Sequence, residues 1–426
     1  MSKPIWVPSP ERVSSSNMAR FQDYIAPRVG HLDFDALHDW SVSHPAEFWS
    51  ELWDFAGVIG DKGEKPWLTD AGKMPGAKFF PTGKLNYAEN LLRYTHENQE
   101  LVFWGEGRVK SRMPGHELRD GVARMQRYLT ARGIVAKDRV AAVMPNMPQS
   151  IVAVLGTASI GAVWSSCSPD FGVQGLLDRF SQIDPKVLVV CDGYYYNGKP
   201  IDITSKIAAI LSKLPAVEHV LVVGYLGDAA QAAARLKEET GHASVLAWDD
   251  ALAPGDPVTV KFERYAFDHP LFILFSSGTT GVPKCIVHSA GGLLLKHLSE
   301  HILHTDIKPD DRVFYFTTLG WMMWNWLVSG LAAGASLLLY DGSPTYPNAE
   351  ILWRFAERER CTHFGTSAKY IDTLKKLGLG PGHGYDVSAL RCIMSTGSPL
   401  SPGSFDYVYH AIKGDVHLAS ISGGTD

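Results

Sequence analysis

A loop rich in hydroxyl groups and glycines follows an apolar run in the second half of the chain. It reads Ser276-Ser277-Gly278-Thr279-Thr280-Gly281-Val282-Pro283-Lys284 and comes directly after residues 271–275, Leu-Phe-Ile-Leu-Phe. Glycines let a backbone turn its N–H groups toward an anion, while hydroxyls add donors and Lys284 adds positive charge. The loop of P-loop NTPases does not fit, because this lysine follows a proline and precedes no hydroxyl. The pattern therefore predicts a phosphate-binding loop after a buried strand.

Apolar and amphipathic stretches alternate on both sides of this loop. Strand-type runs at 139–144, 187–191, 219–223, 336–340 and 391–394 alternate with helix-type stretches at 148–160, 203–214, 349–360 and 368–376. This alternation predicts an α/β fold of mostly parallel sheets with helices on their faces. No period of 20–50 residues repeats, which excludes a solenoid. Residues 249–258 are expected to form a linker, and the glycine-rich residues 378–384 a loop.

Composition limits the possible partners. The chain has 426 residues, enough for two or three packed subdomains, and a net charge of −5 without a basic run. We therefore expect neither a nucleic-acid nor a membrane partner. The five cysteines are at least 24 residues apart, which argues against a zinc ribbon or a disulfide framework and favours a cytoplasmic protein. Residues 313–340 carry no charge, yet the glycines within them favour strand, helix and strand over a membrane span.

The phosphate loop resembles that of the adenylate-forming family, which includes acyl-CoA synthetases, luciferases and peptide-synthetase adenylation domains. The flanking Phe272-Ile273-Leu274-Phe275, Ile286-Val287-His288 and Gly291-Gly292 are most similar to the acetyl-CoA synthetase branch. The resemblance implies two mostly parallel sheets flanked by helices, plus a further β subdomain that is incomplete here. It also implies an N-terminal cap region at 1–98 and an AMP-binding core at 99–426. The family's small C-terminal domain, with its catalytic lysine, is expected beyond position 426, so this chain alone is expected to be weakly active or inactive.

The resemblance assigns nucleotide-binding and metal roles to three segments. Family members join a carboxylate to AMP, release pyrophosphate and pass the acyl group to a thiol, so ATP, Mg²⁺ and CoA are the expected cofactor and co-substrates. Where acetyl-CoA synthetases have Trp-Trp-Gln-Thr-Glu, this chain has Ser422-Gly423-Gly424-Thr425-Asp426. Thr425 and Asp426 are the expected catalytic residues, with Thr425 on the α-phosphate and Asp426 as the Mg²⁺ ligand. The remaining expected nucleotide contacts are Ser276, Ser277, Gly278, Thr279, Thr280, Gly281, Lys284, Gly397, Ser398, Pro399, Ser422 and Gly424.

The acyl pocket is expected at Trp321, Met322, Met323, Thr396 and Gly423. Gly423 replaces an indole of the acetyl-CoA synthetases, which should leave room for an acid longer than acetate. The Thr396 hydroxyl could donate a hydrogen bond to a keto oxygen, so a 3-keto acid is favoured. Two simpler interpretations stay open: Trp321 as a core aromatic beside Trp324 and Trp326, and 395–399 as an ordinary strand-to-helix turn.

The N-terminal part of the chain resembles the subfamily that activates acetoacetate. The similar segments are 5–10, 80–92, 167–172 and 192–199, which together imply ATP-dependent ligation of acetoacetate to CoA through acetoacetyl-AMP, with release of AMP and pyrophosphate. A departure lies near 195–199, where acetyl-CoA synthetases carry two arginines for CoA phosphate and this chain has only Lys199. Alternatives are a synthetase for propionate or butyrate, and a truncated, silent nucleotide-binding homologue.

A competing motif lies just after the loop. His297, Glu300 and His301 match the H-x-x-E-H pattern of inverted zinc peptidases, and His304 extends the same helix face. No third metal ligand can be identified from the sequence. Partly exposed structural histidines are therefore the default interpretation of this motif.

Overall fold

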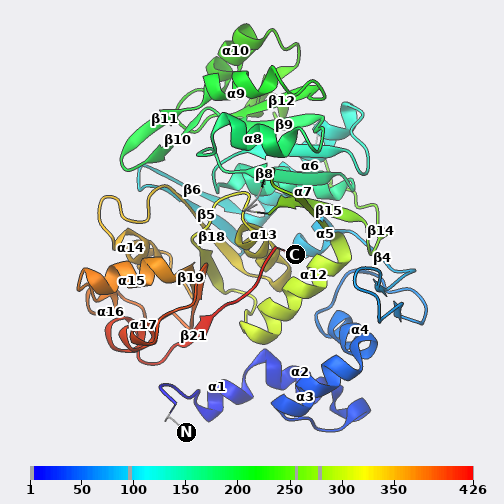
Figure 1. The fold of residues 1–426 in the computed structure, drawn as a ribbon, viewed down its shortest axis with the longest axis vertical. Helices are drawn as coiled ribbons and strands as arrows, with labels where there is room; N and C mark the ends of the chain where they lie inside the picture. The colour runs from blue at the N-terminus through cyan, green and yellow to red at the C-terminus, as the bar shows by residue number, and fades with distance from the viewer. Residues whose placement is uncertain (1–3, 95–97, 255–257, 277–280, 426) are drawn as a thin grey trace.

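Two large sheets organise the structure, a computed structural model that describes residues 4–94, 98–254, 258–276 and 281–425 (Figure 1). Each has seven strands within the described residues, and each is parallel except at one edge, where an antiparallel hairpin closes it. The prediction of an α/β fold with two mostly parallel sheets is confirmed. Whether a further β subdomain is present stays a prediction.

The first sheet carries the predicted phosphate loop at its hairpin edge. Its strand order is β13 (Val245–Ala247), β12 (His219–Val223), β9 (Val187–Cys191), β7 (Arg139–Val143), β8 (Val163–Cys167), β15 (Pro270–Phe275) and β16 (Cys285–Ser289). Every residue of β9 is buried, as a strand covered on both faces requires. β15 runs parallel to β8 and antiparallel to β16.

The second sheet contains strands that are far apart in the sequence. Its order is β21 (His417–Ser420), β20 (Cys392–Thr396), β19 (His363–Ser367), β17 (Arg312–Tyr315), β18 (Ser336–Asp341), β5 (Glu100–Gly105) and β6 (Val109–Pro114). β5 pairs with β18 in parallel, with Leu101 opposite Leu337. β21 is an edge strand that pairs with β20 alone among the described strands.

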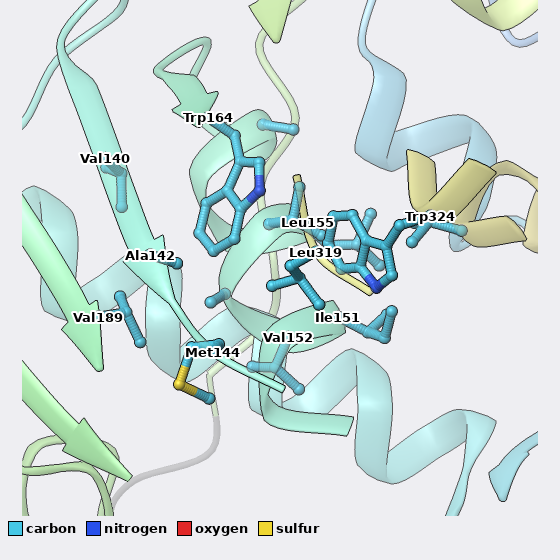
Figure 2. Close-up of a cluster of buried hydrophobic side chains, with 14 of the residues drawn as sticks. Val140, Ala142, Met144, Ile151, Val152, Leu155, Trp164, Val189, Leu319 and Trp324 are labelled. Atoms are coloured by element: carbon cyan, nitrogen blue, oxygen red, sulfur yellow. The ribbon is translucent and has the colours of Figure 1, made fainter. Parts of the chain in front are cut away.

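A shared hydrophobic core joins the two sheets. α7 (Pro148–Ser159) is buried along nearly its whole length beside β7 and β8. Figure 2 shows Trp164 of β8 and Trp324 of α13 (Met322–Ser329) among the aliphatic side chains of this core. The two indole rings are stacked with centroids 6.4 Å apart, and Trp324 donates from Nε1 to Asn146 Oδ1 at 3.0 Å. Helix α13, which follows a strand of the second sheet, is thereby fixed against the first.

The other helices cover the sheet faces and connect the strands. They are α5 (Tyr87–Leu91), α6 (Gly115–Ala131), α8 (Val173–Phe180), α9 (Thr204–Leu211), α10 (Ala229–Thr240), α11 (Trp248–Ala251), α12 (Ala290–Leu298), α14 (Ile351–Arg358), α15 (Ala368–Lys376), α16 (Pro381–Gly384) and α17 (Pro402–Tyr407). Shorter π or 3₁₀ turns continue α12, α13 and α17: η1 (Ser299–His304), η2 (Gly330–Ala333) and η3 (Val408–Ile412).

The N-terminal region forms short helices that start at well-defined caps. α1 (Pro10–Ser14), α2 (Asn17–Val29), α3 (Phe34–Ser43) and α4 (Pro45–Phe55) come first, and the side chains of Ser9, Ser16 and Asp33 cap the first three.

Small antiparallel sheets lie outside the two large ones. They are made by β1 (Gly60–Asp61), β4 (Lys84–Leu85) and β14 (Tyr265–Ala266), by β2 (Leu68–Thr69) and β3 (Lys78–Phe79), and by β10 (Gly193–Tyr196) and β11 (Lys199–Asp202).

Three local predictions can be compared with the backbone. The uncharged residues 313–340 form strand, helix and strand as expected, and none of the described helices is both long and apolar enough to cross a membrane. The loop prediction for 378–384 was wrong in its second half, because α16 begins at Pro381. Gly382 packs there against η3, and a Cβ at this position would lie 2.0 Å from the carbonyl oxygen of Ile412. The expected linker 249–258 starts inside α11 and includes residues 255–257, which lie outside the described part.

Candidate nucleotide and acyl site

The base of the predicted phosphate loop is closed by two hydrogen bonds. β15 and β16 bring Phe275 opposite Cys285, so residues 276–284 connect the two strands of a hairpin. The Ser276 N–H donates to the Lys284 carbonyl at 2.9 Å, and the Lys284 N–H donates to Ser276 Oγ at 3.0 Å. Lys284 and Gly281 are exposed. Ser277, Gly278, Thr279 and Thr280 lie outside the described residues.

The segment after β21 runs back to this hairpin. The Ile421 N–H donates to the Ser395 carbonyl at 2.7 Å, and the Thr396 Oγ1 donates to the Ile421 carbonyl at 3.0 Å. Farther along, His288 of β16 hydrogen-bonds to the Thr425 carbonyl. In Figure 1 the red terminal segment accordingly ends near α12 and α13. The terminal segment therefore connects the end of β20 with β16, the strand that follows the loop, whereas Asp426 is outside the described residues.

The turn after β20 has the conformation that a glycine favours. Gly397 has a φ of +88°, in the left-handed region where a side chain is strained, and a Cβ there would meet no atom within 4 Å. Ser398 and Pro399 are exposed beside it. Because β19, β20 and β21 are parallel, their carboxyl ends share one edge of the sheet, and this turn lies at that edge. Ligands bind α/β sheets at such edges.

The predicted acyl-pocket residues lie at the start of α13, at the end of β20 and in the terminal segment. Trp321 is 58% exposed, while the neighbouring Trp324 and Trp326 are buried, so Trp321 is not a core aromatic. Met322 and Met323 are half-buried. Gly320 approaches β8 closely, since a Cβ on it would lie 3.0 Å from the Ser166 carbonyl oxygen. The start of α13 is thus held near the carboxyl end of β8, in the first sheet.

Gly423 and Thr396 differ in how open their surroundings are. Gly423 is exposed, and a Cβ on it would meet no heavy atom within 4 Å. The Thr396 hydroxyl, in contrast, gives its only proton to the Ile421 carbonyl. While this bond holds, the hydroxyl is an acceptor and not the expected donor to a keto oxygen.

The buried histidines after the loop are structural. Ser329 Oγ donates to the Asn325 carbonyl at 3.0 Å, so it accepts from His297 Nδ1 and from the Tyr87 hydroxyl, each at 2.7 Å. His301 Nε2 donates to the Trp326 carbonyl at 2.9 Å. Burial lowers the pKa of His297 well below its usual value and that of His301 to about 3, so both rings are neutral.

The zinc-peptidase motif therefore gains no support from the structure. Among the described residues, no group of three or more histidine, cysteine, aspartate or glutamate side chains gathers as metal ligands would. The expectation of partly exposed histidines was also wrong for two of them, since His297 and His301 are 1% and 0% exposed. The reason is that α12 and η1 pack against α13, with the His301 ring 4.1 Å from that of Trp326.

A cation near Lys199 was missed by sequence reasoning. Arg108, in the turn between β5 and β6, donates to the Gly198 carbonyl at 2.6 Å and lies over the Tyr195 ring, 5.3 Å from its centroid. The hairpin β10–β11 thus has a second positive charge besides Lys199. The two residues are 91 positions apart, and no local pattern in the sequence links them.

Comparison with known proteins agrees with this arrangement. Residues 94–419 match the family model described as AMP-binding enzyme, and residues 34–91 match that of the acetyl-coenzyme A synthetase N-terminus. Acetoacetyl-coenzyme A synthetase of Rhizobium meliloti (strain 1021) is 54% identical over 426 residues, covering 100% of this chain and 64% of the relative. Malonamoyl-CoA synthetase vrtB of Penicillium aethiopicum is 37% identical, covering 97% of this chain and 60% of the relative.

A solved structure is also similar along the whole chain. Acetoacetyl-CoA synthetase from Streptomyces lividans superposes with a TM-score of 0.92 at 40% identity, covering 100% of this chain and 65% of that one. The chain therefore spans just under two thirds of the length of these relatives. Since the AMP-binding model matches well over half of the residues, the chain belongs to the AMP-binding enzyme family.

Proposed function

We propose that the protein ligates acetoacetate to CoA at the expense of ATP, through acetoacetyl-AMP, releasing AMP and pyrophosphate. The observation that carries the proposal is that the segment 421–425 is hydrogen-bonded both to the end of β20 and to β16, the strand that follows the loop. Relatives of this chain named acetoacetyl-CoA synthetases at 54% and 41% identity support the acid. Malonamate, the acid implied by the malonamoyl-CoA synthetase, has a carbonyl at the same position relative to its carboxylate.

In the first half-reaction, an acetoacetate oxygen attacks the α-phosphorus of ATP and pyrophosphate leaves. The acid is already ionised at neutral pH, so catalysis consists of positioning the reactants and stabilising the developing charge. We assign the β- and γ-phosphates to Lys284 and to the loop hydroxyls, which are Ser276, Ser277, Thr279 and Thr280. Gly278 and Gly281 give that loop its backbone freedom. Thr425 is assigned to the α-phosphate. Ser422 and Gly424, which precede it in the sequence, are assigned to the nucleotide as well, and Asp426 follows it.

We also propose a magnesium ion at Asp426, which lies outside the described residues. A carboxylate next to a phosphate is the donor type that Mg²⁺ prefers. When bound, the ion would neutralise charge on the phosphates. The adenine would lie beside the turn of Gly397, Ser398 and Pro399.

The acyl group is assigned to the space bounded by Trp321, Met322, Met323, Thr396 and Gly423. The exposed Trp321 offers a wall for the methyl end of the acid, and Gly423 leaves the space open. In the second half-reaction the CoA sulfur attacks the acyl carbonyl of acetoacetyl-AMP, and AMP leaves with the bonding electrons. Lys199 and Arg108 supply positive charge for the CoA phosphates.

The organisation of the chain is proposed as an N-terminal cap at 1–98 and an AMP-binding core at 99–426. We further propose a cytoplasmic location, which the five free cysteines support, because disulfides are rare in that compartment.

The test is acid-dependent ATP–pyrophosphate exchange, on the chain expressed to the stop codon of its reading frame. The acids are acetoacetate, malonamate, butyrate, propionate and acetate. We expect the highest rate with acetoacetate. Exchange led by butyrate or propionate would keep the chemistry and replace the acid, and no exchange with any acid would favour a silent nucleotide-binding homologue. Lys284→Ala should lower exchange by roughly 10²-fold, as loss of a transition-state charge contact does, while the exposed Lys376→Ala on α15 should not.

A further inference from the structure

A single side chain ties the hairpin of the phosphate loop to the terminal segment. His288 is four residues beyond Lys284 in β16, and its Nε2 lies 2.5 Å from the carbonyl oxygen of Thr425. A carbonyl oxygen only accepts, so Nε2 carries the proton. Burial, the larger influence, lowers the pKa of His288, and its bond to the Thr425 carbonyl opposes this. The neutral ring thus has a fixed tautomer, with the lone pair on Nδ1.

The other ring nitrogen makes no comparable contact. His288 Nδ1 is buried without a hydrogen-bond partner among the described residues. Within the described part of the chain, the ring therefore hydrogen-bonds through Nε2 alone, and the Thr425 carbonyl determines which nitrogen carries the proton. Protonation of Nδ1 would leave a second N–H buried and unpaired, which is costly.

The segment that His288 holds has little else to fix it. Ile421 makes two hydrogen bonds. Its N–H donates to the Ser395 carbonyl, and its carbonyl accepts from the Thr396 hydroxyl. Among the described residues, the bond to His288 is the only hydrogen bond that residues 422–425 make. Gly423 and Gly424 add no side chains for packing, and glycine backbones lose the most entropy when ordered. Within the described part of the chain, the hydrogen bond to His288 is therefore the contact that fixes the position of Thr425.

We infer that His288 is a positioning residue, which fixes Thr425 against β16, the strand that follows the phosphate loop, through Nε2. The inference rests on the proposed function for its consequence, since Thr425 is assigned there to the α-phosphate. Displacement of a reacting group by about 1 Å can cost 10²-fold in rate. His288 acts through the Thr425 backbone and need not touch the substrate. It also explains why a residue of β16 is coupled to one 137 positions later.

Two isosteric substitutions separate the ring nitrogens. The amide nitrogen of glutamine reaches the position of Nε2, whereas that of asparagine reaches only the position of Nδ1. His288→Gln should keep the bond to Thr425, and His288→Asn should lose it. Amide hydrogen exchange at Ile421, whose N–H is hydrogen-bonded to the Ser395 carbonyl just before the held segment, should be several-fold faster in His288→Asn than in wild type and His288→Gln when measured without nucleotide. Equal exchange in all three proteins would overturn the inference.

The same variants are then compared by acetoacetate-dependent ATP–pyrophosphate exchange. We expect a kcat at least ~10-fold lower for His288→Asn, with the KM for ATP within about 3-fold, and near wild-type values for His288→Gln. A purely structural role would lower both variants together with their thermal midpoints, and an active His288→Asn beside an inactive His288→Gln would contradict the inference. If wild type shows no exchange with any acid, the proposed function fails, and the hydrogen-exchange result alone decides on His288.

Discussion

The Trp6 indole is stacked on the His417 ring, with centroids 6.1 Å apart and ring planes 16° from parallel. Trp6 Nε1 also donates to Asp415 Oδ1 at 2.9 Å, and Arg12 donates to the Arg391 carbonyl at 2.6 Å while lying over the indole. The N-terminal arm, residues 6–12, is thereby attached to β20 and to the edge strand β21. Because β21 leads directly into residues 421–425, the arm supports the strand from which the terminal segment starts.

Trp6→Ala should loosen β21. We expect the opening free energy of the β21 amides to fall by about 1–2 kcal/mol, since a stacked aromatic contact and a hydrogen bond are both lost. Native-state amide hydrogen exchange of residues 417–420 measures this. Val7→Ala is the matched control, because Val7 is 66% exposed, and it should change nothing. Unchanged exchange in Trp6→Ala would show that the arm does not stabilise β21.

Glu359→Ala should be strongly destabilising. This carboxylate is 5% exposed, and it accepts from Trp104 Nε1 at 3.1 Å and pairs with Arg112 and Arg312 at 2.5 and 3.3 Å. Its removal leaves the indole N–H of Trp104 without its acceptor, while Arg112 and Arg312 keep their ion pairs with Glu100, so we expect a loss of about 2–3 kcal/mol in unfolding free energy. Chemical denaturation checks this, with Glu357→Ala, in the last turn of α14 before Glu359, as the control. A loss in Glu359→Ala no larger than in the control would contradict the prediction.

Asp341→Asn should stabilise the protein at pH 8 and change little at pH 4. The pKa of Asp341 is raised to about 7, mainly by burial; the Tyr225 hydroxyl lowers it, and the nearby carboxylates of Glu106 and Asp170 contribute to the rise. A raised pKa means that the folded state binds the proton more tightly, so wild-type stability is full at low pH and falls as pH rises through 7. Asparagine cannot ionise and avoids this loss, which is of the order of 2–4 kcal/mol. The difference in unfolding free energy between the variant and wild type should grow as the pH is raised from 4 to 8. A difference that stays constant over this range would contradict the assignment.

Gly423→Trp should shift acid preference toward acetate. A Cβ at this position would meet no atom within 4 Å, so the backbone has room for a side chain, and an indole would occupy the space assigned to the longer acid. We expect the ratio of kcat/KM for acetoacetate to that for acetate to fall at least ~10-fold. Gly423→Ala, which adds one methyl group, is the control and should retain the wild-type preference. An unchanged ratio in Gly423→Trp would remove Gly423 from the acyl pocket.

Much of the fold could be predicted because buried strands have a simple signature. The runs at 187–191 and 219–223 became β9 and β12 with the same bounds, since apolar residues covered on both faces leave little alternative. The α15 stretch at 368–376 was likewise recovered from its amphipathic pattern. In contrast, α16 was missed because Gly-rich composition hides a single helical turn that is held by a tertiary contact with Ile412.

The site was predictable only in its parts. The loop could be located between strands from the residues at 271–284, and the roles of its residues remain predictions. The contacts between His288 and Thr425, and between Arg108 and Gly198, join segments 137 and 90 residues apart. Such contacts depend on strand order, which local periodicity does not specify. The hydrogen bond donated by the Thr396 hydroxyl is an example, because the accepting carbonyl belongs to Ile421, just after the neighbouring strand β21.

The pairing of β5 with β18 has a consequence for synthesis on the ribosome. Leu101 and Leu337 are partners in this ladder, so 236 residues must be made after β5 before its parallel neighbour exists. At the usual ~5–20 residues per second this takes about 10–50 s. During that time the β5–β6 hairpin can form, but one edge of β5 remains open to pairing with other nascent chains. Expression at high rate should therefore aggregate this protein through its second sheet, and a chaperone that covers strand edges should raise the soluble yield.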